Sequence, residues 1–141
     1  MKRGKLRIKG VSDTATVKQE IQDTVRAIVI LRDGGCILRN VRPVHGEVLQ
    51  ADHLITRANS ATYADTRLIV CVCINCHGWK HWHEREYNAL VRTLIGKDRV
   101  KLWDKCEQDS WRVVRTGVYD WQLTLVALKQ ELKKLSTVAN K

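Results

Sequence analysis

A thirteen-residue segment, CVCINCHGWKHWH at positions 71–83, holds three of the five cysteines and three of the five histidines of the chain. Thiolates and imidazoles are the usual ligands of zinc, and structural zinc is almost always bound by four of them in a tetrahedron. Cys73 and Cys76 have the Cys-x-x-Cys spacing, which places two thiolates on one side of a tight bend. Because two ligands make only half of such a site, the fold must bring two more from elsewhere.

Candidates for those two ligands lie on both sides of the segment. Cys36, in the predicted loop after the first helix, is the third ligand. The fourth has three candidates: His45 in a Pro-x-His-Gly turn, Cys71 just before the Cys-x-x-Cys turn, and Cys106 far downstream. A cysteine that binds no metal is commonly a small buried hydrophobe, which is the other interpretation of Cys71 and Cys106. We predict a zinc site made of Cys36, His45, Cys73 and Cys76, with Cys71 as the alternative to His45.

The charge of the chain indicates an anionic partner. Its 141 residues, a length typical of one domain with modest extensions, include 25 Lys and Arg against 15 Asp and Glu, a net charge of +10. Such an excess is typical of proteins that bind nucleic acid. The first nine residues carry five basic side chains and no acidic one, which predicts a flexible basic arm over residues 1–12.

Apolar runs in the sequence are short. The longest, at 27–31 and 68–74, fall far below the roughly 18–20 residues of a membrane span. The basic N-terminus is not followed by an apolar stretch of signal-peptide type. We therefore expect a soluble intracellular protein with no membrane partner. In a reducing compartment, five cysteines favour metal binding over a disulfide framework.

Apolar spacing and turn residues predict a mixture of helices and short strands. Apolar residues recur at helical spacing from Val17 to Ile28, and Gly34-Gly35 ends that run. Similar spacing follows the ligand segment and recurs near the C-terminus. We predict helices over 17–33, 83–96 and 120–135, short strands at Ile37-Leu38 and Val48-Leu49, a loop over 54–67, and irregular chain over 100–117.

A neighbouring carboxylate and imidazole, Asp52 and His53, follow the second predicted strand. Such a pair can divide its work, because the carboxylate binds a hard cation while the imidazole accepts a proton from water. Isolated Asp-His pairs are common on protein surfaces. This pair comes ahead of a loop and the Cys-x-x-Cys-His cluster, and that order along the chain favours a functional site over an ordinary surface pair.

That order, Asp52-His53, a loop with Asn59, Cys73-x-x-Cys76-His77 and then Lys80, resembles the HNH nuclease motif. It is most similar to the NinG/Rap family of phage recombination proteins, over residues 31–96. The resemblance implies an α+β fold with a small HNH ββα-metal core and a zinc knuckle, flanked by N-terminal and C-terminal helices. The implied domains are a basic arm at 1–12, a nuclease domain at 13–100, and a C-terminal extension with an amphipathic helix at 101–141.

The resemblance also implies a chemistry. His53 would be the general base that activates water for attack on a phosphodiester. Asp52 and His77 would hold the catalytic divalent ion, Mg or Mn, with Zn as the alternative. His81, one helical turn after His77, would face the same ion, whereas His83 points away if the segment is helical. Basic side chains around the site would contact DNA phosphates: Arg57, Arg67, Lys80 and Arg85.

The implied function is that of a metal-dependent DNA endonuclease, a phosphodiester hydrolase of DNA recombination or branched-DNA processing. Its partner would be DNA, its setting the cytoplasm of a phage-infected bacterium, and its assembly a homodimer where a symmetric junction is cut. Trp79 and Trp82 would stack on exposed bases or pack the knuckle against the helix.

The sequence departs from the family pattern at two positions. Arg39 stands where a second knuckle cysteine is usual, which is why His45 is favoured as a zinc ligand. Leu68 stands where the motif usually has its asparagine, so a backbone carbonyl or Asp65 would orient His53 instead. The alternative function is a non-catalytic, zinc-dependent DNA-binding module.

Overall fold

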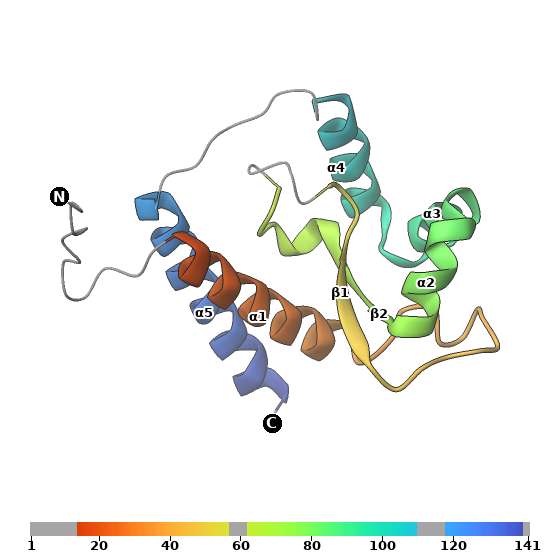
Figure 1. Cartoon of the computed structure of the whole chain (residues 1–141), viewed down its shortest axis with the longest axis horizontal. Helices are drawn as coiled ribbons and strands as arrows, with labels where there is room; N and C mark the ends of the chain where they lie inside the picture. Colours follow the sequence, from red (N-terminus) through yellow and green to blue (C-terminus); the bar gives the residue numbers. More distant parts are fainter. Residues whose placement is uncertain (1–13, 57–61, 110–117, 140–141) are drawn as a thin grey trace, which may run out of the picture.

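The computed structural model describes residues 14–56, 62–109 and 118–139. Within these ranges the chain has an α+β fold with five α-helices and one two-stranded antiparallel hairpin (Figure 1), which confirms the predicted class. The elements in chain order are α1 (Thr14–Asp33), β1 (Leu49–His53), the 3-10 helix η1 (Thr66–Leu68), β2 (Ile69–Cys73), α2 (Ile74–Trp82), α3 (Glu84–Leu94), α4 (Lys97–Gln108) and α5 (Val118–Ala139).

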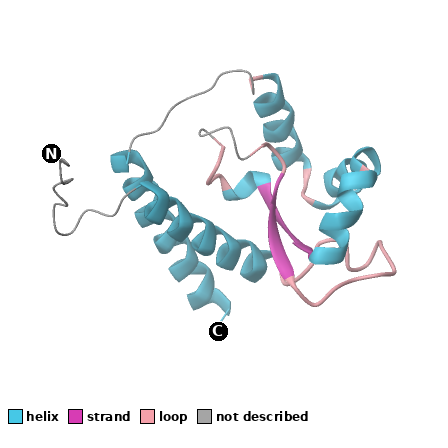
Figure 2. Cartoon of the chain, in the orientation of Figure 1, coloured by secondary structure: helices cyan, strands magenta, loops and turns pink. Residues whose placement is uncertain are grey.

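The hairpin lies between the long helices α1 and α5 on one side and the helices α2 to α4 on the other (Figure 2). Its register sets Leu49 opposite Cys73 and Asp52 opposite Val70. All of β2 is buried, whereas β1 is mostly half-buried and leaves one side of the hairpin accessible. This accessible strand carries the predicted Asp-His pair.

Helices α1 and α5 pack against each other and cover one face of the hairpin (Figure 1). The apolar residues that predicted the first helix form its buried stripe, which meets Trp121, Leu125 and Leu128 of α5. Both helices were predicted from the spacing of their apolar residues, and both are confirmed. In the part of the chain that the structure describes, no helix is long and apolar enough to cross a membrane.

The opposite face of the hairpin packs against a second core. Val70 and Val72 of β2 contact the side of the molecule built by Tyr87 and Val91 of α3 and Trp103 of α4, all almost fully buried. Because side chains alternate along a strand, Ile69 and Cys71 belong to the α1–α5 core instead. The two cores thus share one buried strand.

The strand predicted at Ile37-Leu38 is wrong, because residues 37–41 form turns. The Arg39 N–H donates to the Cys36 carbonyl at 3.1 Å, and the Val41 N–H donates to the Leu38 carbonyl at 3.0 Å. Leu38 is fully buried in this turn. The apolar pair therefore marks a core contact, and the partner of β1 is the apolar run at 69–73.

The irregular chain predicted over 100–117 is also wrong for residues 100–108, which belong to α4. Gly96, with φ +88°, provides the bend between α3 and α4 that a side chain would strain. Trp103 is buried on one face of α4, and charged residues on the other faces obscured the apolar spacing. The domain boundary predicted at residue 100 falls inside this helix, and residues 110–117 lie outside the described ranges.

Candidate metal centre and catalytic pocket

Four side chains converge at the end of the hairpin where β2 leads into α2. The ligand atoms of this group all lie within 4.8 Å of one another, and the set matches the predicted one: Cys36, His45, Cys73 and Cys76. Three of the four residues are buried. Three thiols and one imidazole are a common ligand set for tetrahedral zinc, so this cluster could hold a structural zinc ion.

The turn into α2 sets the two thiols of the Cys-x-x-Cys pair side by side. Cys73 is the N-cap of α2, and its Sγ accepts a hydrogen bond from the Cys76 N–H at 3.4 Å. The N-terminus of a helix favours negative charge, which suits thiolate ligands. Cys36 reaches the pair because α1 ends at two glycines with positive φ, Gly34 at +71° and Gly35 at +132°.

His45 presents one particular nitrogen to the thiols. Its Nε2 lies 2.6 Å from the carbonyl oxygen of Arg42, and because a carbonyl can only accept, Nε2 carries the proton. Nδ1 lies 3.6 Å from the Cys73 Sγ and 3.4 Å from the Cys76 Sγ. Ligands of a tetrahedral zinc at usual bond lengths are separated by roughly 3.5 Å for sulfur and nitrogen. The cluster therefore already has the spacing of a zinc site.

Arg42 is a charged neighbour of this cluster that the sequence did not single out. Its Nη1 lies 3.1 Å from the Cys76 Sγ, and its guanidinium lies 4.4 Å from the centre of the Trp79 ring. Three thiolates around Zn²⁺ leave one net negative charge, which this guanidinium opposes. The only sequence signal for Arg42 is the net negative charge of a Cys₃His zinc site, which a nearby basic side chain would offset.

The two thiols of the pair differ in acidity. Burial opposes ionisation of Cys73, but hydrogen bonds from the Gly46 and Cys76 backbone, together with His45, outweigh it and lower its pKa. Burial and the neighbouring Cys73 sulfur raise the pKa of Cys76, while Arg42 lowers it. Cys73 is therefore the first thiolate of the pair to form as the pH rises.

The remaining two cysteines stand apart from this group. Cys71, the alternative fourth ligand, faces the α1–α5 core on the other side of β2, where burial raises its thiol pKa to about 11. Its backbone N–H donates to the Asp33 carboxylate at 2.9 Å. Cys106 lies half-buried on α4, packed against the second core. Cys73, two residues further on, joins the cluster because the chain turns into α2 there, whereas Cys71 keeps the orientation of the strand.

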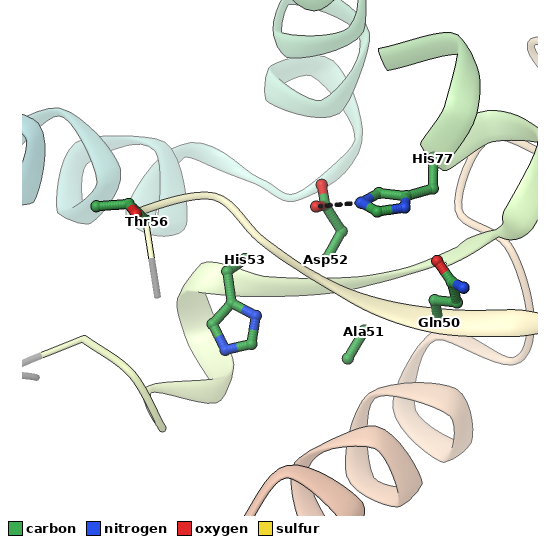
Figure 3. Close-up of a pocket in the computed structure, with 6 residues that line it drawn as sticks. All are labelled: Gln50, Ala51, Asp52, His53, Thr56 and His77. Carbon is green, nitrogen blue, oxygen red and sulfur yellow. Dashed lines mark ion pairs between the residues drawn. The ribbon is translucent and has the colours of Figure 1, made fainter. Parts of the chain in front are cut away.

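The predicted Asp-His pair lines an open pocket of about 540 Å³ beside β1. Successive residues of a strand point to opposite faces. In Figure 3, Asp52 points toward His77 of α2, and His53 lies on the other side of the strand. All three residues predicted to act together line this pocket, but only Asp52 and His77 approach each other. Its lining is Gln50, Ala51, Asp52, His53, Thr56 and His77.

Asp52 is buried, with 5% of its surface exposed, and three protein groups surround its carboxylate. Lys80 Nζ lies 3.1 Å from Oδ1 and 2.9 Å from Oδ2. The Tyr87 hydroxyl donates to Oδ2 at 2.5 Å, and His77 Nε2 lies 3.5 Å from Oδ1. Burial and the Asp52 charge raise the Tyr87 pKa far above its ordinary value, so its hydroxyl remains a donor.

His53 is half-buried and held by a backbone group. Its Nε2 lies 2.9 Å from the carbonyl oxygen of Tyr63, so Nε2 carries the proton and Nδ1 the lone pair of the neutral ring. A backbone carbonyl was one of the two orienting groups predicted from the sequence. The other, Asp65, pairs with Arg67 at 2.7 Å instead.

The other two histidines of the ligand segment lie outside the pocket lining. The exposed His81 ring has its centre 5.3 Å from that of His77. Asp52, His77 and His81 do not form a convergent group of three ligands, since within the described ranges only the Cys/His cluster does so. His83 follows the last residue of α2 and stacks on the Trp79 ring at 5.2 Å.

The residues predicted to contact DNA have different surroundings. Arg85 is exposed at the start of α3, whereas Lys80 is bonded to Asp52 and its side chain is 19% exposed. Arg67 is exposed but paired with Asp65. Trp82 is 87% exposed, while Trp79 packs against the second core. Arg57 and Asn59 lie outside the described residues.

Comparisons of the chain with family profiles, with curated proteins and with solved structures found no match. Any functional conclusion therefore depends on the residues of these two sites and on their geometry.

Proposed function

We propose that this chain is a zinc-stabilised, metal-dependent DNA endonuclease of the HNH type. The observation that carries the proposal is the pocket beside β1, which Asp52, His53 and His77 line together although they come from two different elements. A carboxylate, a positioned imidazole and a second imidazole are the groups that hydrolysis of a phosphodiester with a divalent ion requires.

His53 has the features of a general base. The Tyr63 carbonyl accepts the Nε2 proton of the neutral ring, so Nδ1 is the nitrogen that would act as the base toward water. The ring is also held near the Tyr63 ring, with 5.9 Å between centres. A base held by the backbone needs no separate asparagine, which is consistent with Leu68 at the usual asparagine position.

Asp52 and His77 offer an oxygen and a nitrogen 3.5 Å apart, a donor pair that fits Mg²⁺, Mn²⁺ or Zn²⁺ with further positions left for water and phosphate. A bound ion would neutralise charge that develops on the phosphate and on the leaving oxygen. The pair belongs to β1 and α2, and the neighbouring zinc cluster stabilises the start of the same helix.

Contacts with DNA are supported by charge and by exposed side chains near the pocket. A net charge of +10 gives sequence-independent attraction to phosphates. The exposed Arg85 follows shortly after α2, and the exposed Trp82 ends it. A tryptophan with 87% of its surface exposed suits stacking on an unpaired base, which favours branched or partly single-stranded DNA.

The second candidate function is a zinc-dependent DNA-binding module without catalysis. One observation favours it: the Asp52 carboxylate is already bonded to Lys80 and Tyr87. A site whose carboxylate is satisfied by the protein does not need an ion in order to fold.

A cleavage assay separates the two. Zinc-loaded protein is incubated with linear and branched DNA in Mg²⁺ or Mn²⁺. We expect cutting by the wild type and a loss of about 10²–10⁴-fold in His53→Ala, with DNA affinity kept, because a general base acts on rate and little on binding. His83→Ala, which removes a histidine outside the pocket, is the matched control. A wild type that binds these DNAs but never cuts them would establish the binding module.

A further inference from the structure

We propose that Lys80 is a built-in cation of the pocket, which competes with a divalent metal ion for the Asp52 carboxylate. A metal ion would then bind Asp52 and His77 only by displacing the Lys80 ammonium. The inference deepens the proposed function and rests on its metal site, but the competition itself involves no DNA and no cleavage.

The geometry of α2 makes the two cations alternatives. His77 and Lys80 are three residues apart, so both side chains lie on one face of the helix and reach the same carboxylate. The ammonium contacts both oxygens of Asp52, including the Oδ1 that faces His77. A carboxylate offers about four lone-pair positions. The ammonium and the Tyr87 hydroxyl use three of them, and an ion bound at the remaining position on the His77 side would lie directly beside the ammonium.

Burial makes the competition consequential. Asp52 is 5% exposed and the Lys80 side chain is 19% exposed, so water screens neither charge well. A buried carboxylate without a cation is strongly destabilising. Two cations within a few ångströms of each other repel in such surroundings. One cation beside Asp52 is therefore favoured, and a second is not.

The Lys80 ammonium is held in place by more than its ion pair. It lies 5.0 Å from the centre of the Tyr87 ring, within the range of a cation–π contact. The Tyr87 ring is completely buried, so this contact has a fixed geometry. When displaced, the long flexible stem of Lys80 can carry the ammonium out to solvent, where a DNA phosphate is its natural partner.

Binding of Mn²⁺ to the zinc-loaded full-length protein, measured without DNA by the EPR signal of free Mn²⁺, tests the competition. Lys80→Met keeps the apolar stem and removes the ammonium. We expect it to bind Mn²⁺ at least about tenfold more tightly than the wild type. In the wild type the ion must break hydrogen bonds between Lys80 and the Asp52 carboxylate, and a hydrogen bond to a charged group corresponds to about a tenfold or larger change in affinity. Adding Asp52→Asn to Lys80→Met should abolish the gain.

The control is Lys101→Met, which removes an exposed positive charge on α4. Equal Mn²⁺ affinity in Lys80→Met and in this control would overturn the proposal, as would the absence of Mn²⁺ binding in both. A second readout uses the wild type alone, so it does not depend on the folding of any variant. Saturating Mg²⁺ should increase acetylation of Lys80, and unchanged acetylation would contradict displacement. A protein that shows the competition but never cuts DNA would keep this inference and lose the nuclease.

Discussion

Two groups of side chains, the Cys/His cluster and the Asp52 pocket, share one hairpin and one helix, and they are built in opposite ways. Cys76 belongs to the Cys/His cluster and the next residue, His77, belongs to the Asp52 pocket. Successive residues of an α-helix point about 100° apart, so a single turn of α2 serves both sites. Their difference is in how the protein satisfies the ligands.

In the Cys/His cluster, the ligands mainly face one another. The His45 Nδ1 lies within 3.6 Å of two sulfurs, a grouping in which a cation favours loss of the thiol protons. Arg42 favours binding of that cation, because its guanidinium offsets the excess negative charge of three thiolates. In the pocket, Lys80 takes the place of a cation at Asp52. A basic side chain thus helps metal binding at one site and opposes it at the other.

The two sites differ in how far the fold depends on a bound ion. Within the described ranges, every buried side-chain nitrogen and oxygen has a hydrogen-bond partner, so the Asp52 pocket is complete without an ion. The cysteines join the second core where it meets the loop between α1 and β1. We therefore expect zinc to hold the structure together and the pocket metal to be dispensable for folding.

The largest expected effect comes from removing a zinc ligand. Cys76→Ser should lose zinc and with it the cooperative fold, because structural zinc contributes about 10–16 kcal/mol in small zinc domains at neutral pH, as much as the whole stability of a typical domain. Zinc content by mass spectrometry and thermal unfolding by circular dichroism measure this. Asp52→Asn, the matched change in the other site, should keep its zinc and a cooperative unfolding transition, at a temperature lowered by the loss of the Asp52–Lys80 ion pair. A folded, zinc-containing Cys76→Ser protein would reverse the comparison.

Much of the zinc site could be predicted from the sequence, because thiolates and imidazoles are few and zinc selects them. The Cys-x-x-Cys spacing predicted two neighbouring ligands, Cys73 and Cys76. Cys36 was predicted as the third because it comes directly after the end of the first helix. His45 was preferred to Cys71 because it lies in a Pro-x-His-Gly turn and because Arg39 replaces the usual second knuckle cysteine, while the position of Cys71 relative to the cluster was open. Without the register of the hairpin, two cysteines two residues apart look equivalent; in the structure, the chain turns into α2 at Cys73 and only that cysteine joins the cluster.

The surroundings of the pocket could not be predicted, because they depend on long-range contacts between common residue types. Lys80 was assigned to DNA phosphates from its charge and its place beside the predicted site, and nothing in the sequence indicates that Asp52, 28 positions away, binds its ammonium. The Tyr63 carbonyl has no sequence signature at all. Helix α4 was missed for a related reason, since Trp103 is its one fully buried residue and charged neighbours hide the pattern.

A smaller effect distinguishes the two candidate fourth ligands. His45→Ala should weaken zinc binding by more than the roughly 10–100-fold typical of losing an outer partner of a metal ligand, because it removes a ligand itself. Cys71→Ala should leave zinc affinity unchanged, since Cys71 faces the α1–α5 core. Competition with a coloured chelator measures both affinities. Weaker zinc binding in Cys71→Ala together with normal binding in His45→Ala would assign the ligands the other way round.

The smallest effect tests whether the basic neighbours of the two sites act with opposite sign. Arg42→Gln removes the guanidinium 3.1 Å from the Cys76 Sγ while leaving the backbone carbonyl that orients His45. Because Arg42 lowers the Cys76 pKa, its loss raises that pKa further, and zinc must then displace a more tightly held proton.

Zinc affinity of Arg42→Gln should therefore fall about 10–100-fold, as for other outer-shell partners, and the loss should be the same at any pH well below the Cys76 pKa. Arg42→Lys keeps the positive charge and should lose less. Chelator competition at two pH values measures both variants. If Arg42→Gln instead tightened zinc binding, as Lys80→Met is expected to tighten Mn²⁺ binding, Arg42 would be a competitor of the metal too. The two sites would then differ only in the chemistry of their ligands.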